Sequence, residues 1–371
     1  MAAFVFLYLT SVIVIFLVAS FHYIRPKHGK LLLIGSIFIV SILLALIKPK
    51  EIYDLARHYA ELDVIKNSGM KFWDFVLHSQ KITDANYRYM YTFNVLRYII
   101  AMYFPKQALP FCSCSICFGV FGYILYDVIK QKKISNFYIG ISIMVSAIFM
   151  PMLYIYSGIR NEIAMAIMAL AVYLKIYKGL GIFPYFVLIF LAATMHPLAL
   201  VAIPFVLLSK IRIGKMGIIL VILIPNILYV VMEVCRFSEN GFLRYIGAKF
   251  YNYTFVNIYS QGRFFRYSAI LMTVLLLLLS VIKTKQEKED QRFINFINWY
   301  SIFALANIQS YQISMRIPYL FGILAPVIVS TLFQDVKYCG LKKIFFVLAS
   351  EITLIMGIYS FYSNYMWLLG G

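Results

Sequence analysis

Long apolar runs separated by short polar loops make up most of the chain. An α-helix needs roughly 20 apolar residues to cross the hydrocarbon core of a bilayer, and most of these runs approach that length. The pattern predicts an all-α, polytopic transmembrane helical bundle of about twelve crossings. We place these crossings at residues 2–20, 31–47, 107–129, 136–155, 159–177, 182–195, 197–209, 216–235, 267–282, 293–309, 317–333 and 344–363.

Basic residues recur in alternate loops and predict the orientation of the bundle. Lys and Arg are enriched in cytoplasmic loops of membrane proteins, so these loops should be cytoplasmic and both termini extracytoplasmic. The basic loops surround Lys30, Lys132, Lys178, Arg212, Lys288 and Lys342. Two large loops, 48–88 and 236–266, should then be extracytoplasmic. Residues 1–20 have no basic n-region and no small-residue cleavage site, which predicts a retained first helix. The chain shows no internal repeat and is expected to form a single domain, 1–371.

The segment 89–129 allows two topologies, because its two apolar runs are split at residues 105–107. If both runs crossed, every later basic loop would be inverted. We therefore expect one crossing, at 107–129, and a re-entrant or interfacial helix at 89–104. Arg97 lies within 89–104, and a lipid-facing Arg at mid-depth costs roughly 2.5–3.5 kcal/mol.

Composition excludes a soluble protein and argues against a nucleic-acid partner. Hydrophobic residues make up 63% of the chain, charged residues 13%, and the mean hydropathy is +0.83. The formal charge of +19 comes mostly from the short basic loops. The loop 236–266 is an exception, since a basic excess outside the cell indicates an anionic ligand. It carries Arg236, Arg244, Lys249, Arg263 and Arg266 against one acid, Glu239.

No motif for a metal or a soluble cofactor emerges from the sequence. Cys112, Cys114 and Cys117 form a CxCxxC run, but it lies in an apolar segment without a nearby His. Apolar packing is the favoured interpretation. The chain also lacks a P-loop, a GxSxG elbow and a dinucleotide-binding fingerprint. We expect no metal and no cofactor.

The first external loop contains a charged helical pattern. Asp54, Arg57, His58 and Glu61 fall at i, i+3, i+4 and i+7, on one face of a helix. Two interpretations remain open at this point. The face is either a solvated surface of an interfacial helix or a charged wall over a site.

Arg160 and His196 should face the same aqueous compartment. Arg160 opens the run 159–177, and His196 closes the run 182–195, which returns to the starting side. A cation at a helix N-terminus opposes the helix dipole unless an anion is bound there. The alternative for Arg160 is snorkelling to lipid headgroups. His196 precedes Pro197, where a helix break is expected, and suits either a structural role or a general base.

Three short stretches together resemble the EpsG family of bacterial polysaccharide proteins, related to Wzy-type polymerases. They are Asp-Leu-Ala-Arg-His-Tyr at 54–59, Arg-Asn-Glu-Ile-Ala at 160–164, and His-Pro-Leu-Ala-Leu at 196–200. The family shows Arg-Gln-x-x-Ala and His-x-x-Ala-Leu at the second and third. Asn161 replaces the usual Gln, and the family's Glu-Pro pair is absent around Asn86.

The resemblance implies a GT-C-like polymerase of undecaprenyl-diphosphate-linked oligosaccharide repeat units in the bacterial inner membrane. It would make O-antigen, capsular or exopolysaccharide at the outer face. In this hypothesis His196 is the general base, with Asp54 as the alternative. The residues expected to bind the diphosphate or the glycan are Arg57, His58, Arg160, Arg263, Arg266 and Arg316. The implied partners are the lipid-linked oligosaccharide, membrane lipids, and the chain-length regulator and flippase of the same pathway.

Two other functions compete with polymerisation. A glycolipid transporter or flippase would need charged residues inside the membrane, and Glu351 and Arg97 are candidates. Glu351 also suits a structural hydrogen bond. A membrane O-acetyltransferase acting on the same glycans would use external His and Arg residues.

Overall fold

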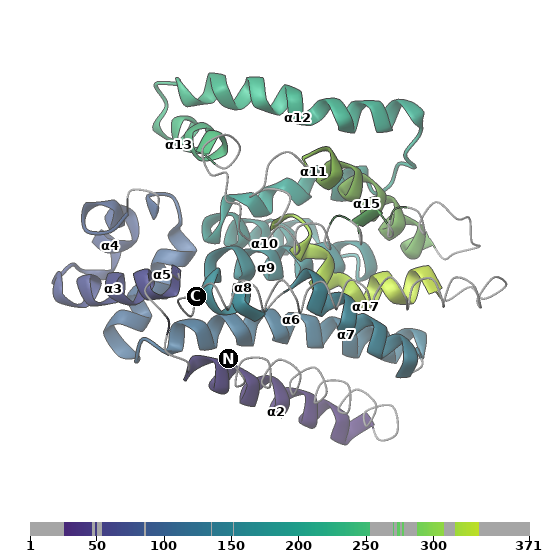
Figure 1. The fold of residues 1–371 in the computed structure, drawn as a ribbon, viewed down its shortest axis with the longest axis horizontal. Helices are drawn as coiled ribbons and strands as arrows, with labels where there is room; N and C mark the ends of the chain where they lie inside the picture. The colour runs from purple at the N-terminus through teal and green to yellow at the C-terminus, as the bar shows by residue number, and fades with distance from the viewer. Residues whose placement is uncertain are drawn as a thin grey trace, which may run out of the picture.

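The computed structural model describes residues 26–46, 49, 54–84, 87–134, 136–150, 152–252, 270, 273–274, 277, 288–307 and 316–333. These described residues form an all-helical structure without strands (Figure 1). The helices are α2 (Pro26–Ala45), α3 (Asp54–Asn67), α4 (Phe72–His78), η1 (Ser79–Lys81), α5 (Tyr91–Tyr103), α6 (Ala108–Lys132), α7 (Asn136–Phe149), α8 (Met152–Ser157), α9 (Ile159–Tyr177), α10 (Ile182–Met195), η3 (Pro197–Ala202), α11 (Ile203–Leu208), α12 (Lys215–Arg236), α13 (Gly241–Tyr251), α15 (Lys288–Ala306) and α17 (Tyr319–Phe333).

Several predicted runs coincide with single helices, and two do not. Helices α6, α9, α10 and α12 match their predicted ranges within a few residues. The predicted run 136–155 is instead divided between α7 and α8. The run 197–209 is a 3₁₀ turn followed by the six-residue α11, with a proline at the start of each. Proline fits the first turn of a helix but cannot continue a preceding one, which accounts for this break. The predicted crossings at 2–20, 267–282 and 344–363 fall largely or wholly outside the described residues.

Helix α9 is the centre of the described structure. It packs against α6, α8, α10, α15 and α17, and most of its side chains are buried. Ala164, Ala166, Ala169 and Ala171 are fully buried along it. Such small side chains allow neighbouring helix backbones to approach closely, as they do in membrane bundles. The first turn of α9, which carries Arg160, is therefore held on a rigid element.

One end of the bundle brings together three of the predicted cytoplasmic loops. The Lys132 ammonium group at the end of α6 pairs with Asp290 at the start of α15. Tyr177 at the end of α9 donates to the same carboxylate over 2.7 Å. Lys178, in the next loop, pairs with Asp127 of α6 over 2.7 Å. These contacts bring the three loops side by side at one end of the bundle.

The opposite end gathers both predicted extracytoplasmic loops. Helices α3 and α4 come from the first loop and α13 from the second. Tyr89 stacks edge-on against Phe242 and Tyr245 of α13, at 5.1 and 5.3 Å between ring centroids. Gly247 allows α13 to fold back on α12, because a Cβ there would lie 2.4 Å from the backbone nitrogen of Arg236.

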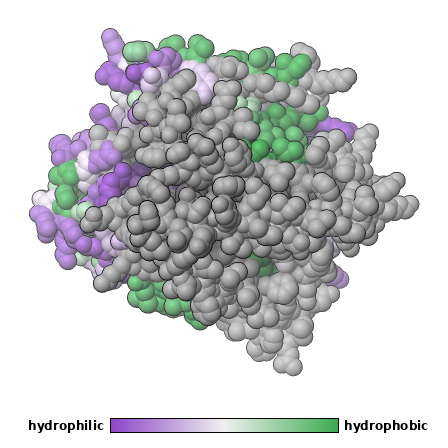
Figure 2. Space-filling view, viewed as in Figure 1, coloured by the Kyte–Doolittle hydropathy of each residue, from purple (hydrophilic) through white to green (hydrophobic). Residues whose placement is uncertain are grey.

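Exposed apolar side chains follow two helices on opposite sides of the bundle. Figure 2 shows hydrophobic surface along α12 and near α2, and hydrophilic surface at the end that carries α3 and α4. The stripe on α12 consists of Ile219, Leu223, Ile227, Val230, Val231 and Val234. By length and composition, one helix in the described part of the chain, α6, could cross a membrane, although a buried core helix can meet the same criteria. The all-α class is confirmed, and the number of crossings stays a prediction.

Candidate functional site

The charged face of α3 is turned toward the protein interior. His58 is only 1% exposed and lies beside Leu55 and Leu62, which are also buried. The Glu61 side chain is 12% exposed. Asp54 and Arg57 form the outer part of this face, as a half-exposed pair with 3.3 Å between Nη2 and Oδ1. The interpretation as a solvated surface therefore holds only for the outer turn, with Asp54 and Arg57. His58 and Glu61 face the interior.

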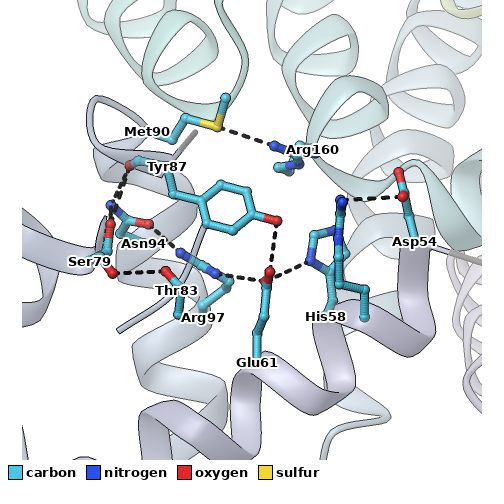
Figure 3. A network of polar contacts seen from close by, with 11 residues as sticks. Asp54, His58, Glu61, Ser79, Thr83, Tyr87, Met90, Asn94, Arg97 and Arg160 are labelled. Carbon is cyan, nitrogen blue, oxygen red and sulfur yellow. Dashed lines mark hydrogen bonds and ion pairs between the residues drawn. The ribbon is translucent and has the colours of Figure 1, made fainter. Parts of the chain in front are cut away.

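The Glu61 carboxylate is the centre of the polar network in Figure 3. It accepts hydrogen bonds from the Tyr87 hydroxyl (3.1 Å) and from Arg97 Nη1 (3.0 Å), and its Oε2 lies 3.2 Å from His58 Nδ1. Arg97 comes from α5 and is fully buried. Asn94, one turn earlier on α5, accepts from Arg97 Nη2 over 2.7 Å. The interior Arg97 noted in the sequence is therefore paired inside the protein, in a helix of 13 residues.

The Tyr87 ring separates two arginines. Figure 3 places it between Arg97 and Arg160. The Arg97 guanidinium lies 4.0 Å from the ring centroid and that of Arg160 lies 4.9 Å from it. Phe93 contacts the same two groups, at 4.9 and 5.6 Å. Cations over aromatic faces are attracted by the ring quadrupole, so both guanidinium groups are held in place by the rings.

Arg160 differs from Arg97 in its counterion. Its Nη1 lies 3.6 Å from the Met90 sulfur, a weak acceptor, and no carboxylate of the described residues forms an ion pair with it. Its side chain is partly exposed at the N-terminus of α9. A fixed cation next to the positive end of the α9 helix dipole favours an anion at this position. The side chain turns toward Tyr87 and Phe93, which does not fit simple snorkelling.

The electrostatics of the network favour a neutral histidine beside an ionised glutamate. Burial, together with the positive charge of Arg160, lowers the pKa of His58 to about 4, despite the hydrogen bond to Glu61. Burial alone would favour the neutral acid form of Glu61. The hydrogen bond from His58 and the charge of Arg97 outweigh it and hold the pKa of Glu61 below its usual value.

His196 lies at the same end of the α9–α10 hairpin as Arg160. It follows the last residue of α10 and is 3% exposed. Its Nδ1 accepts a hydrogen bond from the Leu198 backbone N–H over 3.3 Å and so caps η3. Two residues earlier, the Thr194 hydroxyl lies 2.6 Å from that of Thr92 on α5. This contact ties the end of α10 to the helix that carries Phe93 and Arg97.

Arg316 lies just before α17, which packs against α9. Its charge acts on the buried carboxyl group of Glu162 in the first turn of α9. Glu162 Oε1 accepts from Asn161 Nδ2 over 3.3 Å, and Oε2 has no partner among the described residues. The structure thus connects Asp54, Arg57, His58 and Arg160 through one network. It places Arg316 in a second polar cluster near the same helix turn.

Some predicted residues lie outside the described part of the chain, and some site residues had not been predicted. Arg263, Arg266 and Glu351 belong to the first group. Tyr87 and Asn94 belong to the second. Glu61 was expected only as part of the charged face of the first loop, and Arg97 only as a charge inside an apolar run. The spacing of Glu61 from His58 was a usable signal, because i and i+3 meet on a helix. Nothing in the sequence pairs Tyr87 with either arginine.

Comparison with known families supplies the identification. The family model described as the EpsG family matches residues 81–368. The match includes the 160–164 and 196–200 stretches, whereas the 54–59 stretch on α3 precedes it. Comparison with the curated proteins and with the solved structures gave no match. Since the matched segment is well over half of the chain, the protein belongs to the EpsG family.

Proposed function

We propose that this protein polymerises undecaprenyl-diphosphate-linked oligosaccharide repeat units at the outer face of the bacterial inner membrane. EpsG family members are membrane proteins of the Wzy-type, exopolysaccharide-related group, which supports a role in polysaccharide polymerisation. The observation that carries the proposal is Arg160. It is a cation held by two aromatic rings at a helix N-terminus, with no described carboxylate as its partner.

Arg160 suits the diphosphate of a lipid-linked donor. A guanidinium group offers a planar fork of donors that matches phosphate oxygens, and such charge-assisted bonds are stronger than neutral ones. As the bond to the sugar breaks, negative charge grows on the diphosphate, and a preorganised cation stabilises that charge. Arg316 is proposed as a second diphosphate ligand near α9. On sequence grounds alone, Arg263 and Arg266 are proposed as further ligands.

The proposed reaction is a glycosyl transfer between two lipid-linked glycans. A hydroxyl oxygen of the acceptor sugar forms a bond to the anomeric carbon of the donor glycan. The bond from that carbon to the phosphate oxygen breaks, and the polyprenyl diphosphate leaves with the electron pair. The hydroxyl proton passes to a base on the protein. In this scheme the half-exposed Asp54–Arg57 pair closes the site.

The setting of Arg97 favours polymerisation over transport. A transport path would need charged groups that can bind and release a moving ligand. The Arg97 guanidinium is instead bonded to Glu61 and Asn94 and enclosed by three aromatic rings. These contacts describe a structural cation.

Deleting the gene and analysing glycan chain length tests the proposal. The mutant should accumulate single lipid-linked repeat units and lack long polymer. Purified protein incubated with lipid-linked units extracted from that mutant should then form long chains. If long polymer persists in the mutant and only its acetylation is lost, the protein is an O-acetyltransferase. If units accumulate on the cytoplasmic leaflet and the purified protein forms no polymer, it is a transporter.

A further inference from the structure

The two ring nitrogens of His58 have different environments. Nδ1 lies 3.2 Å from Glu61 Oε2. An ionised carboxylate can only accept a hydrogen bond, so Nδ1 carries the hydrogen and donates it. A neutral imidazole with its hydrogen on Nδ1 has a basic lone pair on Nε2. In the described part of the chain, no group forms a hydrogen bond with Nε2.

Glu61 is fixed by groups from outside its own helix. The Tyr87 hydroxyl and Arg97 Nη1 each donate to it, so the carboxylate is held from α5 and from the segment before α5. Arg97 also balances its charge. A carboxylate fixed in this way sets both the tautomer and the direction of the His58 ring. This is the arrangement of an orienting acid behind a general base.

We propose that His58, oriented by Glu61, accepts the proton of the acceptor sugar hydroxyl. This inference rests on the proposed polymerase function. In the step, the hydroxyl oxygen bonds to the anomeric carbon, its proton moves to His58 Nε2, and the diphosphate leaves toward Arg160. His58 afterwards returns the proton to water. Glu61 is a positioning residue, because it acts through His58.

The two other candidate bases present less suitable groups. In His196, Nδ1 accepts the Leu198 N–H, so the neutral ring carries its hydrogen on Nε2 and has no lone pair there to take a proton. Asp54 is paired with Arg57 and half exposed. His58 is nearly covered. In this proposal the acceptor sugar reaches it when the Asp54–Arg57 ion pair, at the N-terminal turn of α3, opens.

Substrate binding should strengthen this base. Burial and the charge of Arg160 both lower the pKa of His58, while Glu61 and Asp54 raise it. An anion bound to Arg160 would cancel the lowering by that charge. The pKa of His58 would then rise from about 4 toward its ordinary value, which makes Nε2 a better acceptor near neutral pH. The titratable and charged groups around the pair are Asp54, Arg57, Glu61, Tyr87, Arg97 and Arg160.

The test compares three matched variants of the full-length purified protein. His58→Gln can still donate to Glu61 but cannot take a proton, so polymerisation should fall by about 10²–10⁴-fold. Its Tm should match that of the wild-type protein. Its affinity for inorganic diphosphate, the probe for the Arg160 site, should stay within a few-fold of wild type. His196→Gln should lose less than about tenfold. His78→Gln, an exposed site on α4 at the same end, is the control and should behave as wild type.

Folded His58→Gln that polymerises within a few-fold of wild type overturns the assignment, even if His196→Gln is inactive. If the wild-type protein itself does not polymerise extracted units, the proposed function fails and this inference falls with it.

A second measurement examines Glu61. Glu61→Gln keeps an oxygen for Nδ1–H but removes the charge that stabilises protonated His58, so the acid limb of the rate profile should move to lower pH. Glu61→Gln leaves the buried Arg97 without its counterion. If this variant unfolds, the double variant Glu61→Gln/Arg97→Met, which also removes the cation, replaces it in the measurement. An acid limb that does not move in the folded variant would show that Glu61 does not act on His58.

Discussion

Arg97 and Arg160 contact the same two aromatic rings, Tyr87 and Phe93, but differ in their counterions. Arg97 is fully buried and bonded to Glu61. Arg160 is partly exposed and has no described carboxylate partner. The neighbours of each arginine therefore decide its role. Arg97, paired with Glu61, is a structural cation, and Arg160 is available to an anionic ligand.

This difference predicts the effect of Arg160→Lys. Lysine keeps the positive charge but loses the planar fork, so polymerisation should fall by about ten- to a hundredfold. Membrane levels of the protein should be unchanged, because the side chain is not a buried packing element. Arg97→Lys is the contrast and should lower protein levels. Polymer made at the wild-type rate by Arg160→Lys would rule out the diphosphate clamp.

The lowered pKa of His58 predicts that acid weakens the fold. The unfolded chain binds a proton on this histidine below about pH 6.5, whereas the folded protein binds it only near pH 4. The stabilisation is therefore complete above pH 6.5 and is lost as the pH falls toward 4, by on the order of 3 kcal/mol. The lowered pKa of Glu61 acts in the same direction, at still lower pH.

Thermal unfolding measured between pH 7 and pH 4.5 checks this prediction. The Tm of the wild-type protein should decrease over this range, and His58→Gln should show a shallower decrease. His78→Gln should keep the wild-type slope. Equal slopes for His58→Gln and wild type would mean that His58 is already protonated in the folded state.

At the scale of elements, Asp290 joins four helices at the end opposite to the candidate site. It begins α15 and pairs with Lys132 of α6, while Tyr177 of α9 and Thr331 of α17 donate to it over 2.7 and 3.3 Å. The Lys132 and Asp290 side chains are nearly buried. This network should hold the ends of the four helices in register.

Removing one charge of this pair should be costly. Asp290→Asn leaves Lys132 buried without a counterion, at a cost of about 3–5 kcal/mol. The double change Lys132→Met and Asp290→Leu removes both charges and should recover most of the Tm. The exposed pair Lys106–Asp63 provides the control, where Asp63→Asn should cost under about 1 kcal/mol. Equal losses at Asp290 and Asp63 would contradict a structural role for the buried pair.

At the scale of the whole molecule, the predicted topology implies that residues at the two ends of the bundle are accessible to reagents from opposite sides of the membrane. Lys66 and Glu239 are exposed at the end with α3 and α13, and Lys130 is exposed at the other end. Single cysteines at 66 and 239 should react with an impermeant reagent in intact cells, and a cysteine at 130 only after permeabilisation. Lys130 is preferable to Lys132, which is held by Asp290. Labelling of position 130 in intact cells would mean that 89–104 also crosses the membrane.

The sequence by itself determined several of the long helices and one part of the candidate site. Apolar runs of helix length fixed α6, α9, α10 and α12, because helix formation there depends on local composition. The i, i+3 and i+4 spacing on α3 grouped Asp54 with Arg57, and His58 with Glu61, because a helix brings such positions together. The family stretches at 160–164 and 196–200 mark Arg160 and His196 from the sequence alone.

Only the tertiary structure decided what these residues contact. Whether α3 faces water or the interior depends on α5, which supplies Arg97, and on Tyr87, which precedes it. The tautomer of each histidine depends on its partner, Glu61 for His58 and the Leu198 N–H for His196. These contacts join segments distant in sequence, such as Tyr87 and Arg160. No local pattern encodes them, since they arise from the packing of separate helices.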